Sequence, residues 1–281
     1  MANVLDGVRV VSLAINLPGP LAAASLAELG ATVIKVEPPS GDPLAAAAPA
    51  WYNKLTAGQK VVALDLKAPH DRAELDLLLQ NADILLTANR PSALRRLGLL
   101  DAGNGPNPRM SHVEIVGHDG DREETPGHDL NYQAAHGTLQ APNMPLAPIA
   151  DLMGAERAVQ SALAAILIAN KTGRGSHHRV VLEDAAYDAG AAVRNGLTGA
   201  GTPLGGAMAT YGIYATAEGH VALGAIEPVF QKRTLALLNV DDDKDALAAA
   251  FATKTAKEWE SLGVAHDIPL TAVRTSTPKT R

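Results

Sequence analysis

Short runs of β-branched residues alternate with helix-forming segments along the first part of the chain, and this alternation most constrains the fold. A strand is expected over 8–13 (VRVVSL), and a turn over 18–20 (PGP) follows it. An alanine-rich helix is expected over 21–29, with a glycine stop after it, and a second strand over 32–36. This order of strand, turn, helix and strand is typical of a βαβ unit.

The alternation continues as far as residue 190. Further strands are expected over 61–66, 84–87, 113–116 and 177–182, and further helices over 68–80, 91–97, 151–171 and 183–190. Strands that are separated by helices predict a doubly wound, Rossmann-like parallel sheet with both faces covered. The fold class expected for this large domain is therefore α/β.

A glycine-rich stretch separates this region from a shorter one. Residues 196–206 contain five glycines, a composition typical of a loop or linker. We therefore expect a large α/β domain over 1–195 and a smaller α+β domain over 206–281, joined by a linker over 196–205. The smaller domain is expected to hold a hairpin with strands over 210–215 and 220–225, followed by helices over 228–238, 244–252 and 254–262.

The composition excludes several classes of protein. The chain contains no cysteine, which excludes disulfides, thiolate nucleophiles and cysteine-ligated metals. Its formal net charge of −6 offers no general attraction to nucleic acids or anionic lipids. The first residues lack the basic and apolar regions of a signal peptide, and no apolar stretch of about 18 residues is free of charge. We therefore expect a cytoplasmic protein without a membrane or nucleic-acid partner.

The first strand–helix turn, over 18–20, is a candidate ligand site. The G-x-G-x-x-G spacing of dinucleotide-binding folds is absent there, so a nicotinamide enzyme is not expected. The helix start after the turn suits a phosphate group, and a tight turn without a ligand is an equally good interpretation.

Three residues are candidates for chemistry because of their local surroundings. His128 lies in a polar segment at a loop-to-helix junction and suits a general base, while a capping or solvent-facing histidine fits as well. Asp151 begins the long helix, where an aspartate is a cap, a carboxylate that the helix dipole keeps ionised, or both. Glu227 follows an apolar strand and either starts a helix or orients a histidine.

Other charged segments favour structural interpretations. The basic segment 171–175 is expected to cap the long helix rather than to bind phosphate. The three arginines of 90–96 leave the same two interpretations open. His177 and His178 are neighbours on a strand, so they point to opposite faces, and no further ligand follows at a suitable spacing. No metal site is therefore expected there.

Motifs along nearly the whole chain occur in the order that is found in one protein family. They are 5–10 (LDGVRV), 18–20 (PGP), 29–37 (LGATVIKVE), 41–43 (GDP), 82–85 (ADIL), 90–91 (RP), 96–99 (RLGL), 127–132 (GHDLNY), 171–175 (KTGRG), 211–219 and 224–230. On these motifs the chain resembles the family III CoA-transferases. The GHDLNY motif is similar to that of the α-methylacyl-CoA racemase branch of this family.

The resemblance implies an enzyme that processes acyl-coenzyme A thioesters without a metal or a redox cofactor. It implies that His128 and Asp151 are two bases that move a proton at the α-carbon of the acyl group, with Glu227 supporting His128. It also implies that six residues contact coenzyme A: Pro20, Lys35, Lys60, Arg90, Arg96 and Tyr132. In the transferase branch, the same aspartate is a nucleophile that forms aspartyl intermediates.

Three functions therefore remain open, in this order of preference. The first is a racemase or epimerase of a 2-methylacyl-CoA, and the second is a CoA-transferase that uses Asp151 as its nucleophile. The third is a degenerate, non-catalytic member of the family. The third is motivated by 57–60 (AGQK), which replaces a more basic stretch of the family, and by a C-terminus that is shorter than is usual in the family.

The resemblance also implies a homodimer. Members of the family form interlocked, ring-shaped dimers in which the end of the chain returns to the first domain. This chain stops soon after 268–273. A homodimer is therefore expected, and interlocking is left open.

Overall fold

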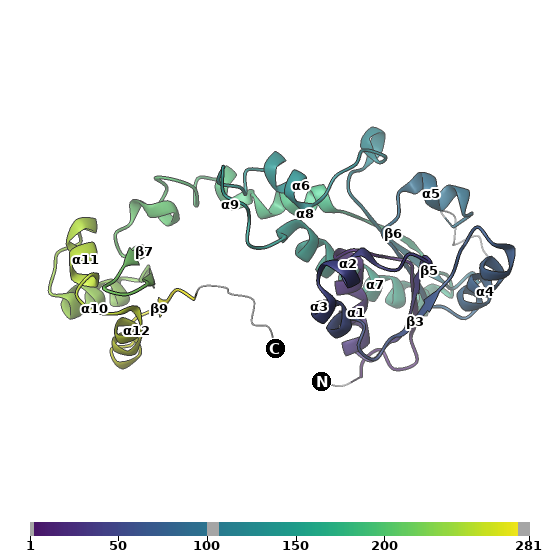
Figure 1. The fold of residues 1–281 in the computed structure, drawn as a ribbon, viewed down its shortest axis with the longest axis horizontal. Helices are drawn as coiled ribbons and strands as arrows, with labels where there is room; N and C mark the ends of the chain where they lie inside the picture. Colours follow the sequence, from purple (N-terminus) through teal and green to yellow (C-terminus); the bar gives the residue numbers. More distant parts are fainter. Residues whose placement is uncertain (1–2, 100–106, 275–281) are drawn as a thin grey trace. The chain divides into compact units, whose positions relative to one another are not determined.

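A six-stranded parallel sheet forms the centre of the first of two units in this computed structural model (Figure 1). The structure describes residues 3–99 and 107–274. Its two units are Met1–Gly190 and Ala191–Arg281. The strand order of the large sheet is β3-β2-β1-β4-β5-β6, so the direction of winding reverses between β1 and β4. In doubly wound folds, ligands bind at the carboxyl edge of the sheet beside such a reversal.

The first unit alternates strands with helices. Its strands are β1 (Arg9–Ser12), β2 (Thr32–Glu37), β3 (Lys60–Ala63), β4 (Ile84–Thr87), β5 (Ser111–Val116) and β6 (His177–Val181). Its helices are α1 (Pro18–Glu28), α2 (Pro43–Ala47), α3 (Pro49–Leu55), α4 (Pro69–Gln80), α5 (Pro91–Arg96), the short η2 (Gly120–Arg122), α6 (Asp129–Ala135), α7 (Ile149–Thr172) and α8 (Leu182–Ala189). Every strand pair in the sheet is parallel, which confirms the predicted α/β class.

Two apolar layers hold the sheet between its helices. One layer joins β1 to α7 through side chains such as Val10 and Ala158. The opposite layer joins the sheet to α4 and α5 through Leu85, Leu75 and Leu94. Alternate residues of a strand serve opposite layers, because successive side chains of a strand point to opposite faces.

Helix α7 is long and apolar enough to cross a membrane, judged by length and composition only. Its small residues Ala155, Ala158, Ala162 and Ala165 are buried in the layer between the sheet and α1. The core helix of a globular unit passes the same test of length and composition, and α7 has the packing of such a helix.

Helix α1 begins earlier than the sequence pattern predicts. The expected turn over 18–20 is wrong, because these residues form the first turn of the helix. Proline fits there because the first N–H groups of a helix have no partner within it. A β-carbon on Gly19 would lie 2.1 Å from the β-carbon of Ala14. Only glycine therefore lets α1 approach the end of β1 this closely.

The second unit contains an antiparallel sheet of order β7-β8-β9. Its elements are α9 (Ala191–Arg194), the π-helical segment η3 (Pro203–Ala207), β7 (Tyr211–Ala215), β8 (His220–Gly224), α10 (Pro228–Leu238), α11 (Lys244–Phe251), α12 (Ala256–Ala265) and β9 (Leu270–Ala272). The rings of Tyr214, Phe251 and Trp259 pack together in its core. This small sheet with flanking helices has the α+β class that was expected for the C-terminal part.

The predicted linker over 196–205 stays a prediction. The two units of the structure divide between Gly190 and Ala191, so the glycine-rich segment lies within the second unit. The N–H of Leu204 donates a hydrogen bond to the carbonyl of Leu197, which folds this segment back on itself.

Candidate active site

A cavity of about 240 Å³ lies at the carboxyl edge of the large sheet, where the order of strands reverses. Residues that follow β1, β4 and β5 form its floor, and the start of α7 and the segment that leads into α6 form its walls. Its polar and charged lining residues are Asn16, Asn89, Arg90, Glu123, Thr125, His128, Tyr132 and Asp151. Four residues predicted from the sequence therefore meet in this cavity: Arg90, His128, Tyr132 and Asp151.

The other predicted residues lie outside the cavity. Pro20 is buried in the first turn of α1. Lys60 begins the edge strand β3 and Arg96 ends α5, and both are exposed. Glu227 is an exposed residue of the second unit, directly before α10. The roles predicted for these four residues stay predictions.

Lys35 has a structural environment that differs from the expected one. Its side chain is completely buried and forms ion pairs with Glu37 and with Asp42, the latter at 2.7 Å. The Tyr52 hydroxyl donates a hydrogen bond of 2.9 Å to Glu37. The ammonium group therefore has no surface for coenzyme A in this structure. Asp42 also accepts a hydrogen bond of 3.0 Å from the backbone N–H of Asn16, so the cluster supports the cavity wall from behind.

His128 lies at the boundary between the loop and α6. Its backbone is extended and caps the helix, and its N–H donates a hydrogen bond of 3.1 Å to the side chain of Asn131. The side chain is exposed and lines the cavity. The backbone of His128 therefore caps α6 while the residue lines the cavity, and its predicted role as a general base stays a prediction.

Asp151 lies inside the first turn of α7 and is not its cap, so the predicted capping role is wrong. Burial, and after it the negative charge of Asp129, raises the pKa of Asp151 to about 7. Burial therefore acts against the ionised form of Asp151, which the helix dipole was expected to favour. A carboxyl with this pKa takes up and releases a proton near neutral pH.

The cap of α7 comes from Asp129, a residue that the sequence pattern does not single out as functional. One carboxylate oxygen accepts hydrogen bonds from the N–H groups of Ala150 at 2.8 Å and Asp151 at 3.3 Å. Pro148, the residue directly before α7, provides no side-chain cap. The available signal was the position of Asp129 inside the GHDLNY motif, next to His128.

Tyr132 is a buried residue of α6 that fits between two glycines. A β-carbon on Gly117 would lie 2.2 Å from its hydroxyl oxygen, and one on Gly127 would lie 2.7 Å from the ring. Burial, followed by the negative charge of Asp151, raises the pKa of Tyr132 to about 12. The hydroxyl is therefore a neutral hydrogen-bond donor at physiological pH.

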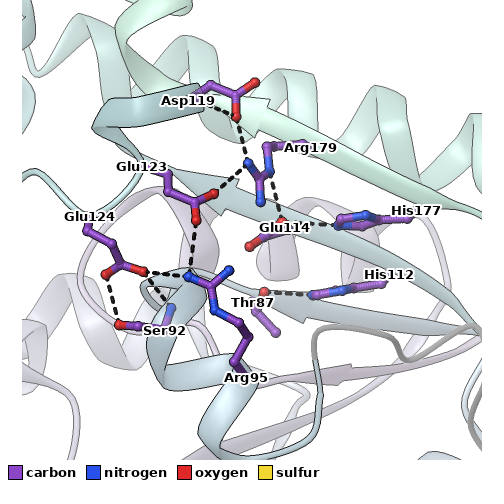
Figure 2. Close-up of polar contacts among 11 residues, drawn as sticks. Thr87, Ser92, Arg95, His112, Glu114, Asp119, Glu123, Glu124, His177 and Arg179 are labelled. Carbon is purple, nitrogen blue, oxygen red and sulfur yellow. Dashed lines mark hydrogen bonds and ion pairs between the residues drawn. The ribbon is translucent and has the colours of Figure 1, made fainter.

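A network of ion pairs holds the loop that forms one wall of the cavity (Figure 2). Its members come from α5, β5, β6 and the loop: Ser92, Arg95, Glu114, Asp119, Glu123, Glu124 and Arg179. Arg179 contacts the buried Glu114 at 3.0 Å and Glu123 at 3.1 Å. Arg95 contacts Glu123 from the other side at 3.1 Å. Arg95 is thus engaged by the loop, whereas Arg90 lines the cavity.

The pair of histidines on β6 divides between the two faces of the sheet, as expected. His177 stacks on His112 with 4.9 Å between ring centroids, and it contacts Glu114 at 3.0 Å. His178 instead contacts the Ser176 hydroxyl at 2.8 Å. Among residues 3–99 and 107–274, no group of three or more histidine, aspartate or glutamate side chains is placed to hold a metal ion.

An apolar pocket of about 220 Å³ adjoins the cavity at the ends of β1 to β4. It shares Ile15 and Asn89 with the cavity, so the two form one trough along the carboxyl edge of the sheet. Leu64 and Leu66 contribute to its apolar lining, and Lys67 provides a positive charge. The sequence pattern does not single out Asn89 or Lys67.

Known proteins resemble the chain in sequence. Alpha-methylacyl-CoA racemase of Homo sapiens is 29% identical, over 96% of this chain and 78% of that protein. The probable fatty acyl-CoA transferase Rv3272 of Mycobacterium tuberculosis is 27% identical, over 93% of this chain and 80% of that protein. Succinate–glutarate CoA-transferase of Agrobacterium fabrum is 29% identical, over 64% of this chain and 51% of that protein.

Solved structures agree with these relatives. The crystal structure of Rv3272 has a TM-score of 0.83 and 25% identity, and covers 98% of this chain and 86% of that one. A CAIB/BAIF family protein from Brucella suis shares the fold, with a TM-score of 0.82 and 22% identity, over 96% of this chain and 84% of that one. Residues 5–278 match the family described as CoA-transferase family III. The chain therefore belongs to CoA-transferase family III, as its motifs predicted.

Proposed function

We propose that the chain is a racemase or epimerase that inverts the α-carbon of a 2-methylacyl-CoA thioester. The observation that carries this proposal is the cavity that both His128 and the half-buried Asp151 line. A carboxyl with a pKa of about 7 is a proton carrier matched to neutral pH, and the imidazole of His128 provides the second proton-carrying group. Relatives whose names carry this activity, such as the human racemase, support the same substrate class.

Two-base chemistry follows from this pair. The α-proton of a thioester is weakly acidic, and inversion requires one base to remove it and an acid on the opposite face to return a proton. Near pH 7, Asp151 is present in both protonation states, so either partner can begin the reaction. The enolate oxygen that develops in between needs hydrogen-bond donors, and the neutral Tyr132 hydroxyl is a candidate.

We propose that the coenzyme A moiety follows the trough from the cavity to the apolar pocket. The flat adenine ring suits a pocket lined by Leu64 and Leu66. Arg90 at the cavity and Lys67 at the pocket supply positive charge for the phosphates. In this arrangement Lys35 supports the wall of the trough and does not contact the ligand.

A CoA-transferase reaction is the second candidate. The specific observation that favours it is a partly ionised aspartate at the cavity wall, since an aspartyl intermediate requires a carboxylate nucleophile. The succinate–glutarate CoA-transferase relative points the same way. Trapping with hydroxylamine during incubation with an acyl-CoA would modify Asp151 in this case, and a racemase would give no such adduct.

Solvent exchange tests the proposed function directly. The protein is incubated with a 2-methylacyl-CoA in D₂O, and deuterium at the α-carbon is measured by mass spectrometry. We expect exchange in the wild-type protein and a loss of at least about 10²-fold in His128→Ala and in Asp151→Asn. Glu156→Gln, which removes an exposed carboxylate from the same helix, serves as the matched control. Full exchange in His128→Ala overturns the proposal.

Binding separates both enzymes from a non-catalytic protein. Calorimetry with acetyl-CoA is expected to show micromolar affinity, and the absence of binding would favour the degenerate member of the family.

Two further predictions accompany the proposal. Glu227→Gln is expected to lower exchange if this residue supports His128, and sedimentation is expected to show a homodimer.

A further inference from the structure

Asp129 joins the two elements that carry the proposed bases. It is the first residue of α6, directly after His128, and its side chain is buried. Its carboxylate accepts the backbone N–H of Asp151 across 22 positions of sequence and that of Ala150 across 21. One side chain therefore links the segment of His128 to the turn of α7 that carries Asp151.

The second carboxylate oxygen of Asp129 is held as firmly as the first. It accepts a hydrogen bond of 2.6 Å from the side-chain amide of Gln133. The same amide donates a hydrogen bond of 3.0 Å to the carbonyl of Ala147, which lies just before α7. The Thr138 hydroxyl donates a hydrogen bond of 3.2 Å to the side-chain amide oxygen of Gln133. This chain of bonds fixes the orientation of Asp129, so its carboxylate is a rigid link between the two helices.

The link has no substitute within α7 itself. The first N–H groups of a helix have no partner in the helix, and Pro148 offers no side-chain acceptor. Asp129 supplies that acceptor from a different element, and its charge strengthens both hydrogen bonds. A neutral acceptor in its place would preserve the cap but remove the negative charge behind Asp151.

We propose that Asp129 is a positioning residue for the proposed reaction: its buried carboxylate fixes the start of α7 against α6, and so sets His128 and Asp151 in their places at the cavity. This inference rests on the proposed function. It predicts a consequence beyond helix stability, because the same carboxylate places a fixed negative charge next to the carboxyl of Asp151.

Several charged and titratable groups lie near Asp151, so a test has to separate the effect of Asp129 from theirs. Arg90, Glu123, His128 and Tyr132 line the same cavity. The charge of Asp129 is the electrostatic cause, second to burial, of the raised pKa of Asp151. Removing that charge while keeping an acceptor should lower the pKa of Asp151, and the kcat of α-carbon exchange then separates a positioning residue from one that serves only as a helix cap.

The test compares wild-type protein with Asp129→Asn, Asp129→Ala and the control Glu156→Gln. Carboxyl-¹³C aspartate labelling follows the titration of Asp151 by NMR without substrate, with Asp151→Asn used for assignment. Solvent exchange at the α-carbon of a 2-methylacyl-CoA is then measured as a function of pH. We expect Asp151 to titrate at lower pH in Asp129→Asn and in Asp129→Ala, and at the wild-type pH in Glu156→Gln.

Kinetics give the second readout. We expect kcat for exchange to fall about 10- to 100-fold in Asp129→Ala, with KM nearly unchanged, because the reacting groups are displaced while the coenzyme A contacts remain. Asp129→Asn should retain more activity and shift the acidic limb of the pH profile downward. A lower unfolding midpoint together with an unchanged Asp151 titration and pH profile would contradict the inference.

The outcomes separate this inference from the proposed function. A shifted Asp151 titration without exchange in the wild-type protein supports the link through Asp129 and contradicts the racemase. Exchange in the wild-type protein with an unshifted titration in Asp129→Asn contradicts the role of Asp129 alone. If the variants do not fold, the wild-type amide protons of Ala150 and Asp151 decide. Their exchange with solvent deuterium should be slow, because both N–H groups donate hydrogen bonds to Asp129, and rapid exchange overturns the inference.

Discussion

At the scale of single residues, the ionisation of Asp151 opposes the stability of the fold. Its pKa is about 7 in the folded protein, against an ordinary value of 3.8 for an aspartate. The folded state thus holds this proton more tightly than the unfolded state. The free energy of unfolding therefore falls as the pH rises from 3.8 to about 7, and the loss is complete above the folded pKa. Such a conflict between stability and chemistry is typical of functional sites.

The first prediction concerns this conflict. We expect Asp151→Asn to raise the free energy of unfolding at pH 8 by a few kcal/mol, at most about 4, because a neutral amide removes the buried negative charge. The gain should shrink steadily as the pH falls toward 4, where the wild-type carboxyl holds its proton. Urea unfolding at several pH values measures it. A gain that is the same at every pH would contradict the assignment of Asp151 as the titrating group.

The second prediction concerns the hydroxyl of Tyr132. We expect Tyr132→Phe to lower kcat for α-carbon exchange by about 10²-fold, because a donor for the enolate oxygen is lost. The ring would still fill the space beside Gly127, so the unfolding midpoint should stay near that of the wild type. Tyr52→Phe is the matched control, since its hydroxyl bonds to Glu37 away from the cavity. That control should lose stability and keep activity, and the reverse pattern would contradict the role of Tyr132.

The roles of single residues were only partly predictable from the sequence. The chemistry of a histidine and the GHDLNY motif sufficed to single out His128, which lines the cavity of the candidate site. The cap of α7 was not predictable, because Asp129 reaches Ala150 across 21 positions and this contact depends on how α6 packs against α7. Local preference favoured Asp151 as the cap, and tertiary packing placed another aspartate there.

At the scale of elements, β2 shows how the position of a strand in the sheet decides whether a charged side chain is exposed or buried. A lysine in a strand motif suggests a surface or a ligand contact. The inner strand of a parallel sheet, however, is covered on both faces. Lys35 is completely buried there, and two carboxylates, Glu37 and Asp42, compensate its charge. The cluster replaces apolar packing at the point where β2 meets the loop before α2.

The third prediction tests this cluster. We expect Lys35→Met to lower the free energy of unfolding by about 3–5 kcal/mol, because two buried carboxylates lose their cation. Lys60→Met on the neighbouring strand β3 is the control, since Lys60 is exposed, and should change stability by less than about 0.5 kcal/mol. Thermal and urea unfolding at pH 7 measure both. Equal effects of the two substitutions would contradict the interpretation of Lys35.

Elements with a clear apolar run or a repeated apolar pattern were predictable, and short elements without either were not. The ranges expected for β4 and α10 agree with the structure at both ends. Helices α2 and α6 and strand β9 have few residues and no repeated apolar pattern, so tertiary contacts decide whether they form. The sequence pattern predicts the start of α1 three residues too late. A proline usually interrupts a helix, but it fits the first turn of one.

At the scale of the whole molecule, the first unit contains two buried groups whose titrations act in opposite directions. Burial, and after it the charge of His177, lowers the pKa of His112 to about 4 from an ordinary 6.5. Between these two pH values the unfolded protein binds a proton at His112 and the folded protein does not. The stability contributed by neutral His112 is therefore present above 6.5 and lost as the pH falls toward 4, whereas the contribution of Asp151 falls as the pH rises.

The fourth prediction follows from this opposition. Between pH 4.5 and 6.5 the two groups nearly cancel, so their joint contribution to the free energy of unfolding should be almost flat. Asp151→Asn should leave the His112 slope and make stability rise with pH by up to about 3 kcal/mol. His112→Gln should give a slope of the opposite sign, and the double variant should be flat again. Trp51 fluorescence in a Trp259→Phe background reports the first unit alone, because each unit contains one tryptophan. Parallel pH profiles for the two single variants would show that neither group governs the pH dependence of this unit.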